Sequence, residues 1–336
     1  MNSRQRVLDF YSEKKIDRIP YSFTDMLTAA KYYGCSMKKF LSSVDIFINA
    51  QKKIIKKVPR DIIFTPLLTS FQAVDFGVEL KYHENQFPTI KKGAMKLEEI
   101  IRKKNYFLKG HNFLLQTTQR LVKEFKNDHF IAGIILCPID FPSCLFPMEE
   151  WFEKILFDRK FAEIFLEFIV NYSIEFTNKM IDAGIDLILI PNGTLKTDFY
   201  SLELIKDLLM PFFKKFVESL SLPVIMHHGG SRIEDMVEIF SEIENIIGLS
   251  IDFRDSFKRI REKTGDRFFL MGNMNCFSID DMKAESIKLY AKNIIEERKN
   301  DDKYAFGFTG AGTLYNTSVD KLILLKDVIE EYGKKI

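Results

Sequence analysis

Short runs of apolar, β-branched residues alternate with longer amphipathic stretches along most of this chain. Near-continuous apolar strands are typical of a parallel sheet that is buried on both faces. Strand and helix alternating about eight times predict an α/β fold, a (β/α)8 TIM barrel. A doubly wound open sheet would show the same alternation and remains an alternative. The candidate strands are Arg18–Phe23, Asp61–Pro66, Ile131–Cys137, Asp186–Ile190, Pro223–His227, Ile246–Asp252, Arg267–Met271 and Tyr304–Thr309.

The stretches between the strands predict helices and a single domain. Residues 24–60 and 67–130 are long for simple crossovers, so we expect extra N-terminal helices there and a short hairpin near Lys81–Ile90. No Gly/Ser-rich linker or low-complexity tract divides the chain, which predicts one domain over residues 1–336. Apolar residues at helical spacing predict later helices at Phe161–Ala183, Ser201–Leu220, Ser231–Ile243, Asp280–Arg298 and Thr317–Tyr332.

Charge and composition exclude several classes of protein. The chain has 49 Lys or Arg and 47 Asp or Glu, a formal net charge of +2 at pH 7. That balance gives no electrostatic footprint for nucleic acid or for a membrane surface, so we expect neither partner. No apolar run approaches the roughly 20 residues of a membrane span, and the first residues lack a signal-peptide core. The four cysteines lack CxxC spacing, which suits a reducing compartment and predicts a cytoplasmic protein.

Polar residues at the predicted strand ends are the site candidates, because chemistry in a TIM barrel collects where strands end and loops begin. We expect catalytic roles for His227 and His228 after the fifth strand and for Asp252 after the sixth. Adjacent strand residues face opposite sides, so one histidine is expected to point into the barrel mouth. The loop after the fourth strand also contains Lys196. Candidate substrate-binding residues at the strand ends are Asp25, Asn192, Asn273, Cys276 and Thr309.

The five histidines and four cysteines include further candidate site residues. Neutral imidazole suits metal ligation, proton transfer or hydrogen bonding near neutral pH, although one histidine of the pair could simply pack or cap a loop. His83, His111 and His129 have no ligand spacing, and we expect them on the surface. The cysteines Cys137, Cys144 and Cys276 could reach the mouth, but a buried core position is the commoner one. The chain has no GxxxxGK[ST] loop, no GxSxG elbow and no HExxH helix.

Several segments resemble the uroporphyrinogen decarboxylase superfamily, and their order extends over nearly the whole chain. DRIP at 17–20, DIIFTP at 61–66 and FPTI at 87–90 resemble its N-terminal part. AGIDLILIPNG at 183–193 resembles its central part. The C-terminal half is similar in PVIMHHGG at 223–230, IGLSID at 247–252, FLMGNMN at 269–275 and FTGAGTLYNTS at 308–318. The resemblance implies the same (β/α)8 barrel.

The superfamily has two main branches, and the chain departs from both. The corrinoid-dependent methyltransferases of the methylcobamide:coenzyme M type hold zinc with one histidine and two cysteines. His227 matches that histidine, whereas Gly229 and Ala311 stand at the cysteine positions. The metal-free decarboxylases have an arginine-rich loop, replaced here by DMLTAAKYYG at 25–34, and a late histidine that also falls at Ala311. The body of the chain resembles the methyltransferase branch more.

The resemblance implies a methyltransferase that moves a methyl group between a small donor or acceptor and a corrinoid (cobalamin) protein. The DxHxxG signature of a corrinoid-binding domain does not occur, so the corrinoid would arrive in trans. His227 is a possible metal ligand, with zinc left open because the usual ligand set is absent.

Two other functions remain as alternatives. In a metal-free decarboxylase or lyase, the two histidines would be acid/base groups, and Arg232 and Arg254 could pair with substrate carboxylates. A non-catalytic barrel would only bind a corrinoid or a partner.

Overall fold

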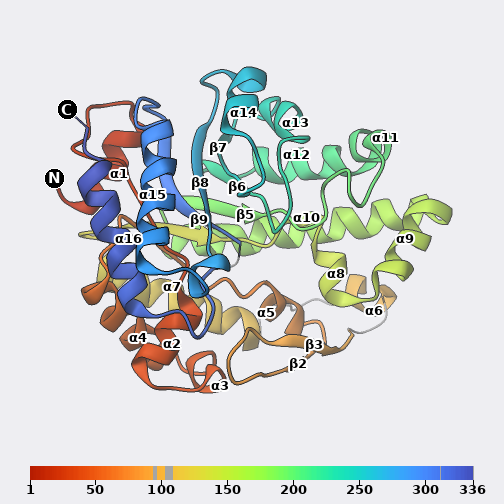
Figure 1. The fold of residues 1–336 in the computed structure, drawn as a ribbon. Coiled ribbons are helices and arrows are strands. Elements are labelled where there is room, and N and C mark those ends of the chain that lie inside the picture. The colour runs from red at the N-terminus through yellow and green to blue at the C-terminus, as the bar shows by residue number, and fades with distance from the viewer. Residues whose placement is uncertain (94–96, 103–108, 311, 336) are drawn as a thin grey trace.

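A curled parallel sheet forms the centre of the computed structural model, which describes residues 1–93, 97–102, 109–310 and 312–335 (Figure 1). Its seven strands lie in the order β1-β4-β5-β6-β7-β8-β9, so each strand pairs with the next parallel strand along the chain. The strands are β1 (Ile62–Phe64), β4 (Phe130–Ile134), β5 (Leu187–Pro191), β6 (Val224–His227), β7 (Ile246–Ser250), β8 (Phe269–Asn275) and β9 (Tyr304–Thr309).

Helices cover the outer face of this sheet (Figure 1). None of them, in the described part of the chain, is both long and apolar enough to cross a membrane. The N-terminal helices are α1 (Ser3–Tyr11), α2 (Met26–Tyr33), α3 (Met37–Phe40), α4 (Val44–Lys57), α5 (Thr69–Val74), α6 (Leu97–Arg102) and α7 (Lys109–Phe125). The later helices are α8 (Phe141–Leu145), α9 (Met148–Phe157), α10 (Arg159–Asp182), α11 (Leu202–Leu204), a π-helical turn (Ile205–Leu209), α12 (Met210–Glu218), α13 (Val237–Ser241), α14 (Phe257–Thr264), a 3₁₀ turn (Ser278–Asp280), α15 (Ala284–Arg298) and α16 (Val319–Tyr332).

Two clusters of buried apolar side chains lie on the two faces of the sheet, as the near-continuous apolar strands require. The smaller cluster lies inside the curl, where alternate residues such as Ile134 and Leu189 point inward. Helix α1 covers one end of it: Val7 and Phe10 belong to this cluster, and the Phe10 ring centroid lies 4.9 Å from that of Phe269. The larger cluster fills the space between the sheet and the helices.

The first predicted strand, Arg18–Phe23, is not a strand in the structure. The segment makes only isolated bridges, from Tyr21 to Phe306 of β9 and from Arg18 to Lys334. The Phe306 N–H donates to the carbonyl of Pro20 at 2.8 Å, and the Asp61 N–H donates to the carbonyl of Tyr21 at 2.9 Å. Pro20 has no N–H of its own, which limits how many ladder bonds this segment can make. Among the described residues, the parallel sheet therefore has seven strands where eight were expected.

The other seven predicted strands are present, and all except Tyr304–Thr309 have shifted ends. The strand expected at Arg267–Met271 begins at Phe269 and continues to Asn275. The hairpin near Lys81–Ile90 is confirmed as β2 (Glu79–Lys81) paired antiparallel with β3 (Thr89–Lys92).

The helix expected at Ser231–Ile243 is wrong over its first half, because only α13 (Val237–Ser241) forms. The Ile233 N–H donates to both carboxylate oxygens of Asp255 at 3.2 Å, and the Glu234 N–H donates to one of them at 3.3 Å. Asp255 lies in the loop that follows the neighbouring strand β7. Its hydrogen bonds hold residues 233–234 in an irregular conformation instead of a helical turn.

The expected surface position of His111 is wrong, since its side chain is fully buried among α5, α7 and α10. Its Nδ1 lies 2.5 Å from Oδ2 of Asp75, and its Nε2 contacts the hydroxyl of Tyr172. The two other histidines without ligand spacing, His83 and His129, are each half-buried and hydrogen-bonded. A single histidine on an amphipathic helix carries no sequence signal that separates a buried polar cluster from a solvated face.

Candidate active site at the carboxyl ends of the strands

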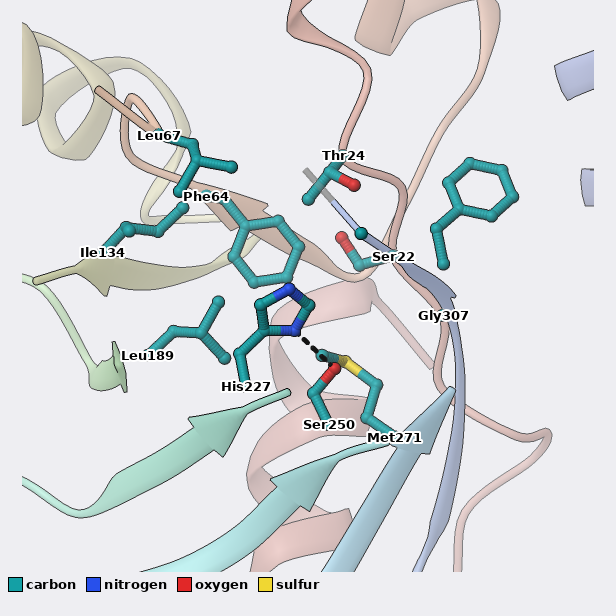
Figure 2. Close-up of a pocket in the computed structure, with 12 residues that line it drawn as sticks. Ser22, Thr24, Phe64, Leu67, Ile134, Leu189, His227, Ser250, Met271 and Gly307 are labelled. Carbon is teal, nitrogen blue, oxygen red and sulfur yellow. Dashed lines mark hydrogen bonds between the residues drawn. The ribbon is translucent and has the colours of Figure 1, made fainter. Parts of the chain in front are cut away.

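His227 is the last residue of β6, and its ring points into the interior of the curled sheet. It lines a small cavity of about 20 Å³, which has room for about one water molecule. Figure 2 shows the ring among mostly apolar neighbours, with the Ser250 hydroxyl on one side. The apolar side chains that line this cavity are Phe64, Leu67, Ile134, Leu189, Met271 and Phe308.

The His227 ring is held neutral. Its Nδ1 lies 2.9 Å from Oγ of Ser250, and only 7% of the residue is exposed. Burial, and next the neighbouring His228, lower the pKa of His227 well below its ordinary value. The hydroxyl of Thr24, which lines the same cavity, has no hydrogen-bond partner among the described residues. The cavity therefore presents the His227 ring, which also interacts with the Gly310 backbone, and the unpartnered Thr24 hydroxyl to a ligand.

His228 turns away from the cavity, as the alternation of strand residues requires. Its Nε2 accepts from the Gly310 N–H at 2.9 Å, and its Nδ1 lies 3.2 Å from Oδ2 of Asp252. The Gly230 N–H also donates to Nδ1 at 3.0 Å, so both ring nitrogens are engaged within the protein. Burial, and next the Lys196 cation, lower the pKa of His228 to about 3, so this ring is also neutral at pH 7. The two histidine rings are adjacent, with centroids 4.3 Å apart.

Asp252 is 2% exposed and connects this pair to the outer loops. Its Oδ1 accepts from Nε of Arg254 at 2.5 Å and from the Arg254 N–H at 3.0 Å. Asn273 donates from its Nδ2 to the carbonyl of Asp252 at 3.2 Å. The structure thus brings together four of the predicted site residues, namely His227, His228, Asp252 and Asn273.

The other predicted site residues have their polar groups engaged within the protein. Asp25 forms a buried two-point ion pair with Arg60, at 2.7 and 2.8 Å. Asn192 bonds Leu195 of its own loop through both side-chain ends, at 2.8 and 3.0 Å. These two side chains build the loops around the site.

Cys276 and Thr309 meet each other beside the site. The Cys276 thiol donates to the carbonyl of Thr309 at 2.7 Å and contacts that of Gly312 at 3.1 Å. Burial raises the pKa of this thiol to about 12, so it is not a thiolate at neutral pH. Thr309, at the end of β9, is 1% exposed.

Lys196 lies beside the histidine pair, and the sequence assigned it no role. The residue is 3% exposed, and its Nζ donates to the carbonyl of His228 at 3.3 Å and to the hydroxyl of Ser231. Burial lowers the pKa of Lys196, and the nearest carboxylates oppose that shift. Its only sequence signal was a position in a loop that follows a strand.

The residues present do not fit the zinc site of the methyltransferase branch. No group of three His, Cys, Asp or Glu able to hold a metal occurs in the described part of the chain. Position 229 has no room for a cysteine, because a Cβ there would lie 2.0 Å from the carbonyl oxygen of Asn192. Cys276 is a neutral thiol bonded to carbonyls. Ala311 lies outside the described residues.

Comparisons with known proteins agree on the fold. A profile of the family described as Uroporphyrinogen decarboxylase (URO-D) matches residues 2–332. A solved methyltransferase from Methanosarcina mazei superposes with a TM-score of 0.86 at 18% identity, covering 99% of each chain. A B12-independent methionine synthase from Shewanella sp. W3-18-1 has a TM-score of 0.57 at 13% identity, over 88% of each chain. A search of curated proteins gave no match. At these identities the two structural likenesses are likenesses of fold.

Proposed function

We propose a methyltransferase function for this chain, which belongs to the uroporphyrinogen decarboxylase family. The observation that carries the proposal is the likeness over 99% of both chains to a Methanosarcina methyltransferase, together with an inward-pointing His227 at the end of β6. The reaction would move a methyl group between a small substrate and a corrinoid. A corrinoid protein would supply that cofactor in trans, and a bound corrinoid would donate or receive the methyl group.

The fold proposed for this function is the closed (β/α)8 barrel. Residues Pro20 to Ser22 make backbone hydrogen bonds to Phe306 of β9 on one side and to Asp61, just before β1, on the other. This short segment would take the place of the eighth strand between the two edges of the sheet. Closure would direct the loops after all the strands toward one mouth.

The chain's own residues would orient the substrate and exclude water. The His227 ring nitrogen that Ser250 does not hold, and the unpaired hydroxyl of Thr24, face the same small cavity. Because burial disfavours the imidazolium, His227 would accept a hydrogen bond from the substrate and so align it for in-line transfer. His228 and Asp252 would keep the β6 loop in place through Gly310 and Arg254. No step is assigned to zinc, since the donor set does not fit it.

A metal-free lyase acting on a carboxylated ligand is the second candidate. The specific observation in its favour is the pair of cations beside His228, namely Lys196 bonded to its carbonyl and Arg254 bonded to Asp252. In that case the cations would hold a substrate carboxylate. The same assay separates the two functions, because only the first consumes a methyl donor.

The test is anaerobic incubation of the protein with methylcob(III)alamin and a thiol acceptor, with and without added zinc, followed by the visible spectrum. We expect loss of the methylcobalamin band that depends on the protein. His227→Ala should abolish it, and so should His227→Asn, which can still reach Ser250 but lacks the ring nitrogen proposed to meet the substrate. His83→Ala, on the hairpin, is the matched control and should leave the rate unchanged. If the band persists in every sample while the protein is folded, the proposed methyl transfer from methylcobalamin to a thiol is wrong.

A further inference from the structure

A second cavity of about 220 Å³ lies beside the His228–Asp252 pair, where the loops after β5, β6 and β7 meet. Lys196 comes from the first of these loops, Arg232 from the second and Arg254 from the third. The carboxylates of Asp198 and Asp235 also line the cavity. Three cations from three separate loops therefore face one polar space, which is distinct from the His227 cavity.

Lys196 is the buried member of this group. Its ammonium has three N–H donors, and the described residues accept two of them, through the carbonyl of His228 and the hydroxyl of Ser231. The third donor has no acceptor within the described residues. An ammonium that is 3% exposed and not fully paired is costly to keep in the fold. An anion in the cavity would offset that cost.

Arg232 and Arg254 bring further donors to the same cavity. Arg232 is exposed and makes no hydrogen bond or ion pair within the described part of the chain. Arg254 uses Nε for Asp252 and Nη2 for the carbonyl of Gly230, which leaves Nη1 for a ligand. Asp198 and Asp235 are exposed to water, so solvent and salt screen their repulsion of an anion more than they screen the buried Lys196.

We propose that this cavity binds the carboxylate or phosphate group of a small ligand, with Lys196, Arg232 and Arg254 as its donors. Guanidinium groups suit oxyanions because their N–H donors match the spacing of two oxygens. The volume of about 220 Å³ admits such a group with a short chain attached. That the ligand is the small methyl-transfer substrate rests on the function proposed above.

The test is calorimetric titration at constant ionic strength with three probes: inorganic phosphate, 3-mercaptopropionate and neutral 2-mercaptoethanol. We expect saturable binding of at least one anion and none of the neutral thiol. The first two probes distinguish a phosphate from a carboxylate ligand. Arg232→Ala should weaken anion binding about 10-fold or more, the loss expected for one charge-assisted hydrogen bond.

Arg259→Ala is the matched control, because Arg259 is 68% exposed, forms an ion pair with Glu234 and does not line the cavity. It should leave the affinity unchanged. The proposal is overturned if neither anion binds saturably, or if both arginine variants weaken binding equally. Because these titrations need no turnover, anion binding without methyl transfer would refute the proposed function alone. Methyl transfer without anion binding would refute this site alone.

Discussion

At the scale of single residues, Gly229 decides how closely the loops after β5 and β6 approach each other. Its φ is +64°, and a Cβ there would lie 2.0 Å from the Asn192 carbonyl oxygen and 2.9 Å from the Gly193 nitrogen. Gly230 also has a positive φ, +99°, but a Cβ there would meet nothing within 4 Å. Gly229 is therefore required both by its backbone conformation and by lack of space. Gly230 is required by its backbone conformation alone.

We predict that Gly229→Ala lowers the free energy of unfolding more than Gly230→Ala does. Both substitutions strain a positive-φ backbone, at a cost of about 1–3 kcal/mol. Only the first also forces the 192–193 loop to move, which adds a further 1–3 kcal/mol or so. Urea denaturation of both variants measures the difference. An equal decrease in the free energy of unfolding in both variants would mean that the loop at Asn192 can move without a measurable energetic cost.

The two buried histidines predict an acid-sensitive fold. An unfolded imidazole has a pKa near 6.5, whereas burial holds the pKa of His228 at about 3 and that of His227 well below its usual value. Between those values the unfolded state binds protons that the folded state does not. The free energy of unfolding should therefore fall as the pH drops below 6.5, by up to about 1.4 kcal/mol per pH unit for each such histidine.

Denaturation at pH 7, 6 and 5 measures this slope while most carboxylates stay ionised. His228→Gln should reduce it, and its side-chain oxygen could still accept from the Gly310 N–H. His83→Gln, on the hairpin, should leave it as it is. A slope that does not change in the His228 variant would show that this ring is not the neutral, buried group described.

At the scale of elements, Asp61 holds the 18–21 segment against the sheet. The residue is fully buried just before β1, and its carboxylate accepts from Arg6 at 2.6 Å, from Arg18 at 2.6 Å and from the Tyr21 N–H at 2.9 Å. This single carboxylate therefore joins helix α1, the bridging segment (residues 18–22) and strand β1.

We predict that Asp61→Asn destabilises the fold by about 3–5 kcal/mol, because it leaves two arginines without their buried counter-charge. Hydrogen exchange should show the first loss of protection at the Ser22 and Phe306 amides, which bond across the bridging segment. Asp17→Asn is the control, since Asp17 is 44% exposed and meets Arg6 from the solvent side. Uniform loss of protection over the whole sheet would contradict this local role.

Hydrophobic periodicity correctly predicted the strands that are buried on both faces. It was less accurate where a few hydrogen bonds to distant residues determine whether a strand or helix forms. The apolar runs at 187–191, 224–227 and 304–309 have no alternative to a parallel sheet. The segment at 18–23 has the composition of a strand, but Pro20 and the competing carboxylate of Asp61 reduce it to a bridge. The first half of the helix expected at 231–243 is lost to Asp255, a partner that sequence spacing cannot reveal.

The prediction of the candidate site succeeded and failed for the same reasons as the prediction of the elements. The ends of the strands located His227, His228, Asp252 and Asn273 in one place, because that depends on topology alone. Asp25 was assigned to the substrate without any knowledge of Arg60, which lies 35 residues away along the chain. Residues whose role depends on a distant partner are those that the sequence could not place.

At the scale of the whole molecule, the two ends of the chain join (Figure 1). The Ile19 N–H donates to the carbonyl of Gly333 at 2.8 Å, and the Lys335 N–H donates to that of Asp17 at 3.0 Å. The larger apolar cluster contains side chains from both ends of the chain, from Ile19 to Ile329. The helices added in the N-terminal third share that cluster with the C-terminal helices.

We predict a single cooperative unfolding transition, because neither half of the chain can keep this cluster buried alone. Calorimetry, together with far-ultraviolet and near-ultraviolet circular dichroism, should give coincident midpoints. Two separated transitions would instead divide the N-terminal helices from the sheet as a second domain.

The contact between Gly229 and Asn192 also bears on which mutational routes are open to this chain. A cysteine cannot enter at 229 until the neighbouring loop has shifted, and a shifted loop gives no benefit until the cysteine is present. A glycine-to-cysteine change at 229 alone would therefore clash with the Asn192 carbonyl instead of creating a metal ligand. We expect laboratory selection for metal binding to find new ligands at other positions on the curled sheet first.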